Sequence, residues 1–207
     1  MMREWYEAHL LPPLLDCACS LAAVTRERAA LLPAAYGSVL EIGIGSGLNL
    51  PHYQADKIER LCGLDPHAGL TRKAAARAQE AGLEVEILQL GAERIPAPDH
   101  SFDTVVCTFT LCTIPDPAPA LAEMRRVLKP QGQLLFCEHG LAPDTGVARW
   151  QSRINRVWSP LAGGCRLDRD GPAWLTKSGF HITELRQRYL PGPKPWTYIS
   201  RGVARPA

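Results

Sequence analysis

Three glycines that alternate after a short apolar run constrain this 207-residue chain more than any other feature. Residues 38–42 are mostly apolar and include Glu41, and Gly43, Gly45 and Gly47 follow at every second position. Glycine lets a backbone pass close beneath a ligand, and a helix that starts after such a loop presents free N–H groups. The pattern predicts a buried strand, a tight loop and a helix that bind a nucleoside-containing molecule.

The spacing of the glycines distinguishes two kinds of ligand. A dinucleotide fingerprint reads G-x-G-x-x-G and receives a pyrophosphate, whereas this chain has G-x-G-x-G with Glu41 two residues earlier. A carboxylate at position 41 would attract a ligand that carries an ammonium group. Residues 60–65 predict a second strand ending in Asp65, which could accept hydrogen bonds from a ribose. The alternative is that the glycines form ordinary turns and that Asp65 caps the helix after Pro66.

Length and composition favour a single domain. A chain of 207 residues that is 46% hydrophobic can form one full core but not two comfortable ones. Seven cysteines without a C-x-x-C pair argue against a disulfide framework or a zinc site, so no metal is expected. Neither a long uncharged apolar run nor the order of a signal peptide is present, which leads us to expect a cytoplasmic protein.

The basic side chains are distributed unevenly. The formal net charge is +2, but residues 149–207 hold eleven Lys or Arg against three acids. Such a segment could contact an anionic membrane or substrate, or it could simply be a solvated face. Because no aromatic residues interleave with a basic stripe, nucleic acid is not an expected partner. Nothing in the sequence fixes the oligomeric state.

Strand and helix patterns alternate through the first two thirds of the chain. They predict strands at 38–42, 60–65, 84–89, 101–107 and 133–137, and helices near 48–53, 67–81 and 118–128, with a loop at 129–132. Such alternation gives a doubly wound parallel sheet that binds ligands at the carboxyl ends of its strands. Five residues are expected near that edge: Glu41, Asp65, Ala92, Thr108 and His139.

The two ends of the chain predict additions to this sheet. Residues 14–32 predict an amphipathic helix, part of an N-terminal helical cap (1–35) that covers the cofactor cleft or only the sheet edge. Residues 141–178 break the alternation and are interpreted as a substrate lid. Residues 180–190 and 196–204 predict an antiparallel hairpin at the edge of the sheet.

These features resemble the class I S-adenosylmethionine-dependent methyltransferases, whose first motif is E-x-G-x-G-x-G and whose second strand ends in an acid. Residues 93–106 are also similar to the segment A-E-x-x-P-x-x-D-x-S-F-D-x-V of small-molecule enzymes in this class. The resemblance implies an α/β, Rossmann-like, doubly wound and mostly parallel seven-stranded sheet in one domain, residues 1–207, with an antiparallel C-terminal edge hairpin and an N-terminal capping helix. It implies S-adenosyl-L-methionine as cofactor, S-adenosyl-L-homocysteine as product, and no metal.

The resemblance also implies a set of cofactor-binding residues: Glu41, Gly43, Gly45, Gly47, Asp65, Pro66, Gly91, Ala92, Glu93 and Thr108. Glu41 is expected near the methionine ammonium group and Asp65 on the ribose. Ala92 and Glu93 are expected beside the adenine. Relatives often have an acid where this chain has Gly91, so the contact with the adenine amino group would come from Glu93, come from backbone, or be missing.

Nearly the whole chain resembles two groups within the class, the alkyl thiol S-methyltransferases and the bacterial phosphatidylethanolamine N-methyltransferases. A thiol is already partly ionised at neutral pH, so one imidazole or a modest positive field suffices to activate it, whereas an amine needs stronger help. We predict a small apolar thiol as acceptor, with the phospholipid as the alternative. A non-catalytic cofactor-binding protein and a nicotinamide oxidoreductase are the rivals from other classes.

Three residues are candidates for the acceptor side. His139, at the end of the strand 133–137, is the best candidate base, or else it holds a supporting position. Cys112 could line the acceptor pocket or be a small buried hydrophobe. Asp168, with Arg166 nearby, could position an acceptor. Three tryptophans predict either an apolar acceptor pocket or ordinary core packing: Trp150, Trp158 and Trp174.

Overall fold

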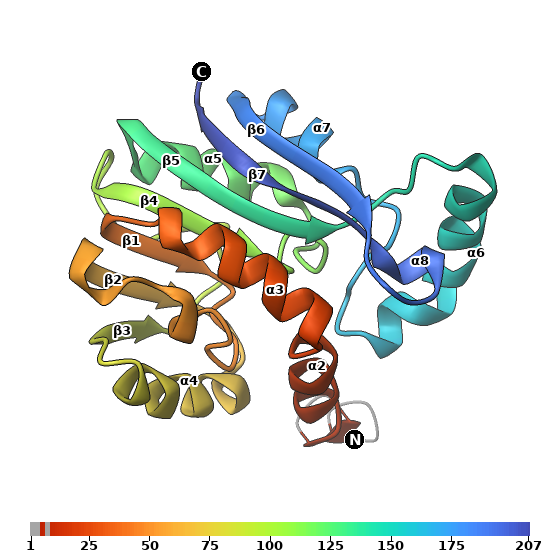
Figure 1. The fold of residues 1–207 in the computed structure, drawn as a ribbon, viewed down its shortest axis with the longest axis horizontal. Coiled ribbons are helices and arrows are strands. Elements are labelled where there is room, and N and C mark those ends of the chain that lie inside the picture. Colours follow the sequence, from red (N-terminus) through yellow and green to blue (C-terminus); the bar gives the residue numbers. More distant parts are fainter. Residues whose placement is uncertain (1–4, 7–8) are drawn as a thin grey trace.

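One sheet of seven strands forms the centre of the molecule in a computed structural model that describes residues 5–6 and 9–207 (Figure 1). Its strand order is β3-β2-β1-β4-β5-β7-β6. The strands are β1 (Gly37–Ile42), β2 (Ile58–Leu64), β3 (Val85–Leu88), β4 (Phe102–Thr108), β5 (Leu128–His139), β6 (Phe180–Tyr189) and β7 (Tyr198–Pro206). β1 to β5 pair in parallel, and β7 pairs antiparallel with both β5 and β6. The predicted mostly parallel sheet with an antiparallel C-terminal hairpin is confirmed.

Helices cover both faces of the sheet. The α-helices are α2 (Leu11–Cys19), α3 (Ala22–Leu31), α4 (Ala68–Glu80), α5 (Pro117–Val127), α6 (Thr145–Leu161), α7 (Gly171–Lys177) and α8 (Lys194–Thr197), and short 3-10 turns are η1 (Leu32–Ala34), η2 (Leu50–His52) and η3 (Ala55–Lys57). Figure 1 shows α3 across the near face and α5 behind the sheet, while α6 and α8 lie to one side of it. This arrangement produces a three-layered body with a lateral extension.

Apolar side chains point to both faces of the central strands, as expected for a parallel sheet covered on both sides. On one face Leu40 and Phe136 pack with Met124 of α5. On the other face Val39 and Leu135 pack with residues of α3 and α4. The carboxyl ends of β1, β2, β4 and β5 therefore meet at one edge of a rigid, fully packed sheet.

Three predicted boundaries are wrong, each for a local reason. The single helix predicted at 14–32 is two helices, because the chain at Leu21 is extended, with φ −52° and ψ 139°. The helix predicted near 48–53 is only the 3-10 turn η2, which contains Pro51. The loop predicted at 129–132 belongs to β5, which pairs with β4 from Leu128 onward across a register irregularity.

Candidate active site

The loop after β1 has a shape that only glycine adopts easily. Gly43, Gly45 and Gly47 have φ angles of 69°, 54° and 80°, in the left-handed region. A side chain on Gly43 would collide with Thr110, and one on Gly47 would lie 2.9 Å from the backbone of Ala74. At Gly45 nothing lies nearer than 3.9 Å to an added Cβ. Packing therefore explains two of the glycines, and the open space at Gly45 leaves room for a ligand above the loop.

Asp65 follows β2 and faces this loop. Its side chain is buried, with Oδ2 accepting a hydrogen bond from the Gly45 N–H at 2.9 Å and Oδ1 accepting one from the His67 N–H at 2.8 Å. Each oxygen keeps a second lone pair with which to accept from a ribose hydroxyl. Asp65 is not the N-cap of α4, because that position is His67. The capping alternative is therefore wrong.

Glu41 lies near the end of β1 and is almost completely buried. Its carboxylate accepts hydrogen bonds from Asn49 Nδ2 at 2.9 Å and from the Tyr53 hydroxyl at 2.7 Å. Burial raises the pKa of Glu41 to about 7, although these hydrogen bonds and the positive charge of Arg28 act in the opposite direction. A cationic ligand bound beside Glu41 would favour the ionised form of this carboxyl group and lower its pKa.

Arg28 is a residue of this site that the sequence analysis missed. It lies on α3, only 5% exposed, and its guanidinium donates to Asn49 Oδ1 at 2.6 Å and to Thr108 Oγ1 at 2.7 Å. Its Nε is buried without a hydrogen-bond partner among the described residues. Arg28 lies three and four positions before the buried Leu31 and Leu32, and therefore on the apolar face of the predicted helix. A charged residue on that face was the one indication in the sequence that Arg28 is buried.

These groups fit S-adenosylmethionine as judged from their own chemistry. The amino-acid end of that molecule carries one carboxylate and one ammonium group. Arg28 provides a buried cation with an unsatisfied donor, and Glu41 provides a buried carboxyl group nearby. Asp65 adds acceptors for a ribose, and the backbone at Gly45 leaves space above it. The residues at this edge of the sheet are therefore suited to hold the cofactor.

The remaining predicted cofactor residues differ in their accessibility. Thr108 is buried and bonded to Arg28 and Asn49. Ala92 is buried in the core beneath the loop, whereas Pro66 and Glu93 are exposed. The Glu93 carboxylate folds back over Gly91, because a Cβ added to Gly91 would collide with it. A carboxylate therefore lies beside position 91, although residue 91 is itself a glycine. This placement is consistent with Glu93 contacting the adenine amino group.

Glu138, the penultimate residue of β5, holds the loop after β4. Its buried carboxylate accepts hydrogen bonds from the N–H groups of Thr110 at 2.9 Å and Leu111 at 3.0 Å. Burial raises the pKa of Glu138, and these hydrogen bonds counteract the shift. Thr110 also packs against Gly43 of the glycine loop. The loop after β4 is therefore fixed between the glycine loop and β5.

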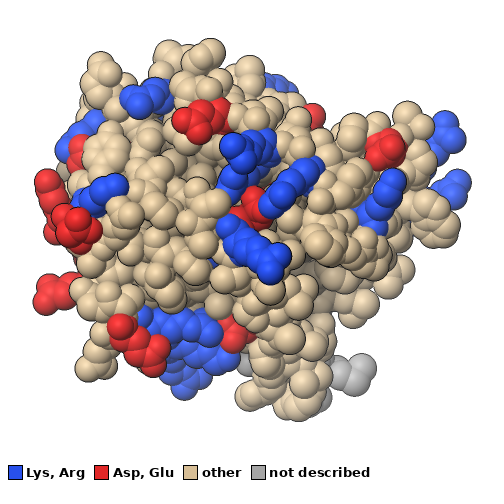
Figure 2. All heavy atoms as spheres, viewed as in Figure 1, with Lys and Arg blue, Asp and Glu red and all other residues tan. Residues whose placement is uncertain are grey.

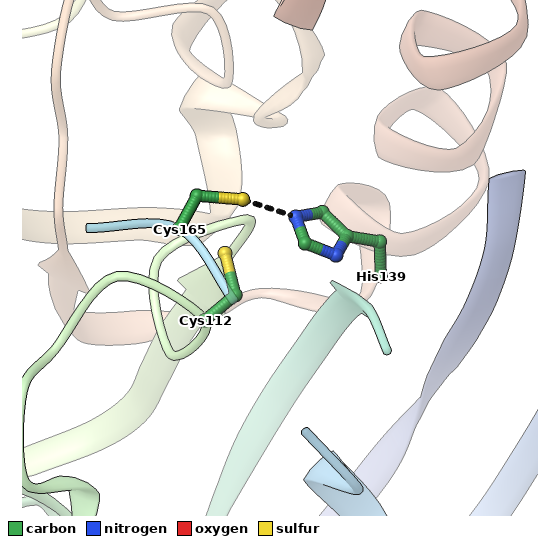
Figure 3. A group of neighbouring side chains, drawn as sticks. All are labelled: Cys112, His139 and Cys165. Carbon is green, nitrogen blue, oxygen red and sulfur yellow. Dashed lines mark hydrogen bonds between the residues drawn. The ribbon is translucent and has the colours of Figure 1, made fainter. Parts of the chain in front are cut away.

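Cys112, His139 and Cys165 form a compact cluster at the same edge (Figure 3). Their sulfur and nitrogen atoms lie within 4.8 Å of one another. His139 Nε2 lies 3.1 Å from Cys165 Sγ, and Trp158 Nε1 donates to the same sulfur at 3.2 Å. His139 Nδ1 is buried and has no partner among the described residues. Residues distant in the sequence thus bring two thiols, an imidazole and an indole together.

The hydrogen bonds in this cluster favour a thiolate at Cys165. Donors from Cys112, His139 and Trp158 converge on its sulfur and lower the pKa of Cys165, against the effect of burial. The pKa of His139 is raised, because the negative charge of Cys165 outweighs the burial that would lower it. The pKa of Cys112 is raised well above its ordinary value by its hydrogen bond to Cys165 and by burial. Both pKa shifts favour the charged forms of the two groups, a thiolate at Cys165 and an imidazolium at His139.

The loop that carries Cys165 is tied to the loop that carries Cys112. The Arg166 N–H donates to the Cys112 carbonyl at 3.0 Å. The Arg169 guanidinium donates to the Pro115 carbonyl at 2.9 Å and also to the carbonyls of Leu111 and Ile114. These bonds join the segment after α6 to the segment after β4. The geometry of the cluster is therefore supported from both sides.

Asp168 and the tryptophans occupy different environments. Asp168 pairs with Arg166, with 3.3 Å between Oδ1 and Nε, and is not a member of the cluster. Trp158 packs against Cys112 and Cys165, which fits an apolar wall. Trp150 is 59% exposed, and Trp174 packs against the main core. Of the three tryptophans, only Trp158 contacts the cluster.

Helix α2 lies between the glycine loop and the Cys165 loop. Asp16 accepts hydrogen bonds from Ser46 of the glycine loop and from Lys73 and Arg77 of α4, the last two at 2.9 and 3.2 Å. A Cβ added to Gly163 would lie 3.2 Å from Leu11. This contact pattern is consistent with the N-terminal helices covering the carboxyl edge of the sheet. The first residues of the predicted cap, 1–4 and 7–8, lie outside the described part.

The basic side chains of residues 149–207 are partly used within the molecule. Arg188 and Arg201 both pair with the buried Glu27, and Arg205 donates to the Gln131 carbonyl at 3.1 Å. On the face seen in Figure 2, Lys and Arg side chains lie in small groups, several of them beside acidic residues. This face therefore has no continuous basic patch. In the described part of the chain, no helix has the length and apolarity needed to cross a bilayer.

Comparisons with known proteins agree with this geometry. Residues 40–136 match the family model described as a methyltransferase domain. Human thiol S-methyltransferase TMT1B is 32% identical over 163 residues, which cover 77% of this chain and 65% of that protein. The phosphatidylethanolamine N-methyltransferase of Cereibacter sphaeroides is 36% identical over 123 residues, 58% of this chain and 59% of that protein. The matched segments therefore span 65% and 59% of the length of these two relatives.

A solved structure shares the fold over most of both chains. The structure of an S-adenosylmethionine-dependent methyltransferase from Aquifex aeolicus superimposes with a TM-score of 0.62 at 17% identity. The match covers 93% of this chain and 97% of that one. At this level of identity the similarity establishes the fold alone.

Proposed function

The chain belongs to the class I S-adenosylmethionine-dependent methyltransferases, and from that premise we propose that it transfers a methyl group to the sulfur of a small apolar thiol. The observation that carries the choice of acceptor is the cluster of His139, Cys112 and Cys165 beside the apolar Trp158. An imidazole whose pKa is raised, as that of His139 is, suits an acceptor that reacts as an anion. The thiol S-methyltransferases named among the relatives support the same choice.

The donor side of the proposal uses the residues around the glycine loop. Asp65 accepts hydrogen bonds from the ribose, and Arg28 binds the carboxylate of the methionine end. Glu41 attracts the ammonium group at the same end of the ligand. Gly45 leaves the backbone open beneath the ligand, and Glu93 lies beside the adenine. When bound, S-adenosylmethionine supplies an electrophilic methyl group on a sulfonium centre. The protein has to align that group with the acceptor and exclude water from between them.

The acceptor side of the proposal uses the opposite half of the edge. A thiol needs only modest help to ionise, because its pKa lies about 1.5 units above neutrality. The pKa of His139 is raised by Cys165, and in its protonated form this imidazole would stabilise the thiolate of a bound acceptor. Trp158 and Ala162 offer apolar surface for the remainder of the acceptor. Residues 141–178 act as the substrate lid, residues 1–35 act as the cap, and the whole chain works as one domain.

Phosphatidylethanolamine is the second candidate acceptor. The relative from Cereibacter sphaeroides carries that activity in its name, and the last quarter of the chain is rich in basic residues. Peripheral contact with anionic lipid would bring such an acceptor to the lid. Several of those basic residues are engaged within the protein, which weakens this candidate relative to the thiol.

A single competition assay tests the proposal. S-adenosylmethionine with a trideuterated methyl group is incubated with the full chain, a panel of alkyl and aryl thiols, and vesicles of phosphatidylethanolamine, and the products are resolved by mass. We expect deuterated thioethers. Labelled phospholipid without labelled thioethers would replace the thiol by the lipid. Tight binding of S-adenosylhomocysteine without any labelled product would indicate a cofactor-binding protein instead.

A further inference from the structure

The cluster of Cys112, His139 and Cys165 has a feature that cofactor binding and thiol acidity do not account for: its donor atoms converge on one point. One ligand atom from each residue lies within 4.8 Å of the other two. In Figure 3 the two sulfurs and the imidazole nitrogen face the same small space from three separate segments. An ordinary packed core has no need of this convergence, since a cysteine in such a core acts as a small apolar side chain.

The dimensions are close to those that a tetrahedral metal ion requires. Zinc bonds of about 2.3 Å to sulfur and about 2.0–2.1 Å to nitrogen place neighbouring ligand atoms roughly 3.5–3.8 Å apart. His139 Nε2 and Cys165 Sγ are 3.1 Å apart. To bind an ion, these two atoms would have to move apart by only about half an ångström, which small side-chain rotations can provide. Two thiolates and an imidazole are a soft ligand set that favours zinc over magnesium or calcium.

The surroundings of the cluster resemble the supporting shell of a metal site. The indole N–H of Trp158 donates to Cys165 Sγ at 3.2 Å, a contact that orients a sulfur ligand. The Arg166 N–H and the Arg169 guanidinium fix the loop of Cys112 against the loop of Cys165. Glu138 holds the loop of Cys112 to β5, the strand that carries His139. All three ligands are therefore positioned before any ion arrives.

We propose that Cys112, His139 and Cys165 bind one zinc ion through two thiolates and one imidazole, and that the open fourth position of the ion receives the acceptor thiol. The second half of this inference rests on the proposed function. Three protein ligands with one open position are the pattern of catalytic rather than structural zinc. The odd number of cysteines and the missing C-x-x-C pair led us to expect no metal, but they argue only against a zinc site built from a local motif, and these three ligands come from different segments.

The ion would replace the imidazole as the group that activates the thiol. The acceptor thiol loses its proton to solvent and binds zinc as a thiolate. Its sulfur then forms a bond to the methyl carbon, the bond from that carbon to the sulfonium sulfur breaks, and the electron pair stays on the departing sulfur. The product thioether is neutral and a weaker ligand than the thiolate, so it leaves the ion. His139 serves as a zinc ligand in this form and not as a base.

Cobalt binding tests the ion site without any methyl transfer. The full chain, reduced and freed of metal with a chelator, is titrated with Co²⁺ alone and then with Zn²⁺. We expect one Co²⁺ per chain, a sulfur-to-cobalt charge-transfer band and the visible bands of tetrahedral cobalt, all lost when Zn²⁺ displaces the ion. No charge-transfer band at micromolar protein would overturn the proposal.

Matched variants assign the ligands. Cys112→Ser and Cys165→Ser should each remove at least half of the charge-transfer intensity, whereas Cys62→Ser, which changes a buried cysteine of β2, should leave it unchanged. Trp158→Phe keeps all three ligands but removes the N–H donor to Cys165, and should weaken binding about tenfold. Binding of S-adenosylhomocysteine checks that each variant is folded. A band that survives in both Cys112→Ser and Cys165→Ser would contradict the assignment.

Binding of the acceptor thiol to the fourth position of the ion is tested separately. A small alkyl thiol added to the cobalt form should intensify the charge-transfer band as a third sulfur enters the fourth position, and an unchanged spectrum would overturn that part of the proposal. If metal-free and zinc-loaded enzyme methylate thiols equally fast, the role of zinc is wrong and the proposed function stands. If cobalt binds as expected but neither form methylates any thiol, the proposed function is wrong and the ion site stands.

Discussion

The two halves of the carboxyl edge are built in different ways. The half around β1 and β2 is assembled largely from one continuous stretch, in which Glu41, the three glycines and Asp65 lie within 25 residues of one another. The half around β4 and β5 brings together Cys112, His139 and Cys165, which are separated by 26 residues or more. A local motif can therefore reveal the first half, whereas only the folded chain reveals the second.

In the function that we propose, the same difference divides the methyl donor from the methyl acceptor. The contiguous half contains the groups suited to a ribose and to a charged amino-acid end, which every member of a cofactor-dependent family has to bind. The dispersed half contains the soft and apolar groups that we propose choose an acceptor, and these lie on loops, on α6 and at the end of β5 rather than on a shared motif. Shared cofactor motifs accordingly say little about the acceptor.

The largest expected effect comes from removing the ribose acceptor. Asp65→Ala should weaken S-adenosylhomocysteine binding at least about 100-fold, because two hydrogen bonds to a charged group are lost, each contributing about 1.5–3 kcal/mol. Isothermal titration calorimetry measures the change. Asp56→Ala, an exposed acid in η3, is the matched control and should bind normally. Affinity within threefold of wild type would remove Asp65 from the donor half.

A smaller effect is expected at Arg28, a donor-side group that lies outside the contiguous stretch. Arg28→Met should weaken S-adenosylhomocysteine binding about tenfold or more, since a charge-assisted hydrogen bond to the ligand carboxylate is lost. The exposed Arg26→Met is the control. A decarboxylated analogue of the ligand should bind wild type and Arg28→Met equally. Equal weakening of both ligands would mean that Arg28 acts only through the fold.

The smallest effect is a pH dependence at Glu41. Because the pKa of Glu41 is raised from the ordinary 4.5 of a glutamate to about 7 in the folded protein, ligand-free protein loses stability as pH rises from about 4.5 through 7. Only the ionised carboxylate favours a cationic ligand, so affinity for S-adenosylhomocysteine should rise about fourfold between pH 6.5 and 8. In Glu41→Gln this rise should disappear. A pH profile that is identical in the variant would assign the titration to another group.

The sequence predicted the fold well because its signals are local and repeated. Strands that alternate with helices, and that end at or next to Gly43, Asp65, Thr108 and His139, are enough to predict a doubly wound sheet and its ligand-binding edge. The errors lie where short segments decide the outcome. The break at Leu21 and the extension of β5 from Leu128 depend on neighbouring contacts and have no strong signal of their own.

The site was predicted less evenly. Asp65 and the glycines carry their meaning in their spacing, and the structure puts them beside one another. Arg28, Asn49 and Tyr53 were missed because a polar residue on a helix or turn acquires a role only when the fold buries it against a partner. The convergence of Cys165 on His139 requires a loop that no spacing rule describes.

The most direct test of this division is a single-turnover measurement with trideuterated S-adenosylmethionine loaded in advance. Wild type and His139→Asn are mixed with a small alkyl thiol, and the deuterated thioether is followed by mass. We predict equal loading and a transfer rate about 100-fold slower in His139→Asn, with the exposed His181→Asn unchanged. Equal transfer rates in all three proteins, or normal loading without any thioether in wild type, would contradict the account.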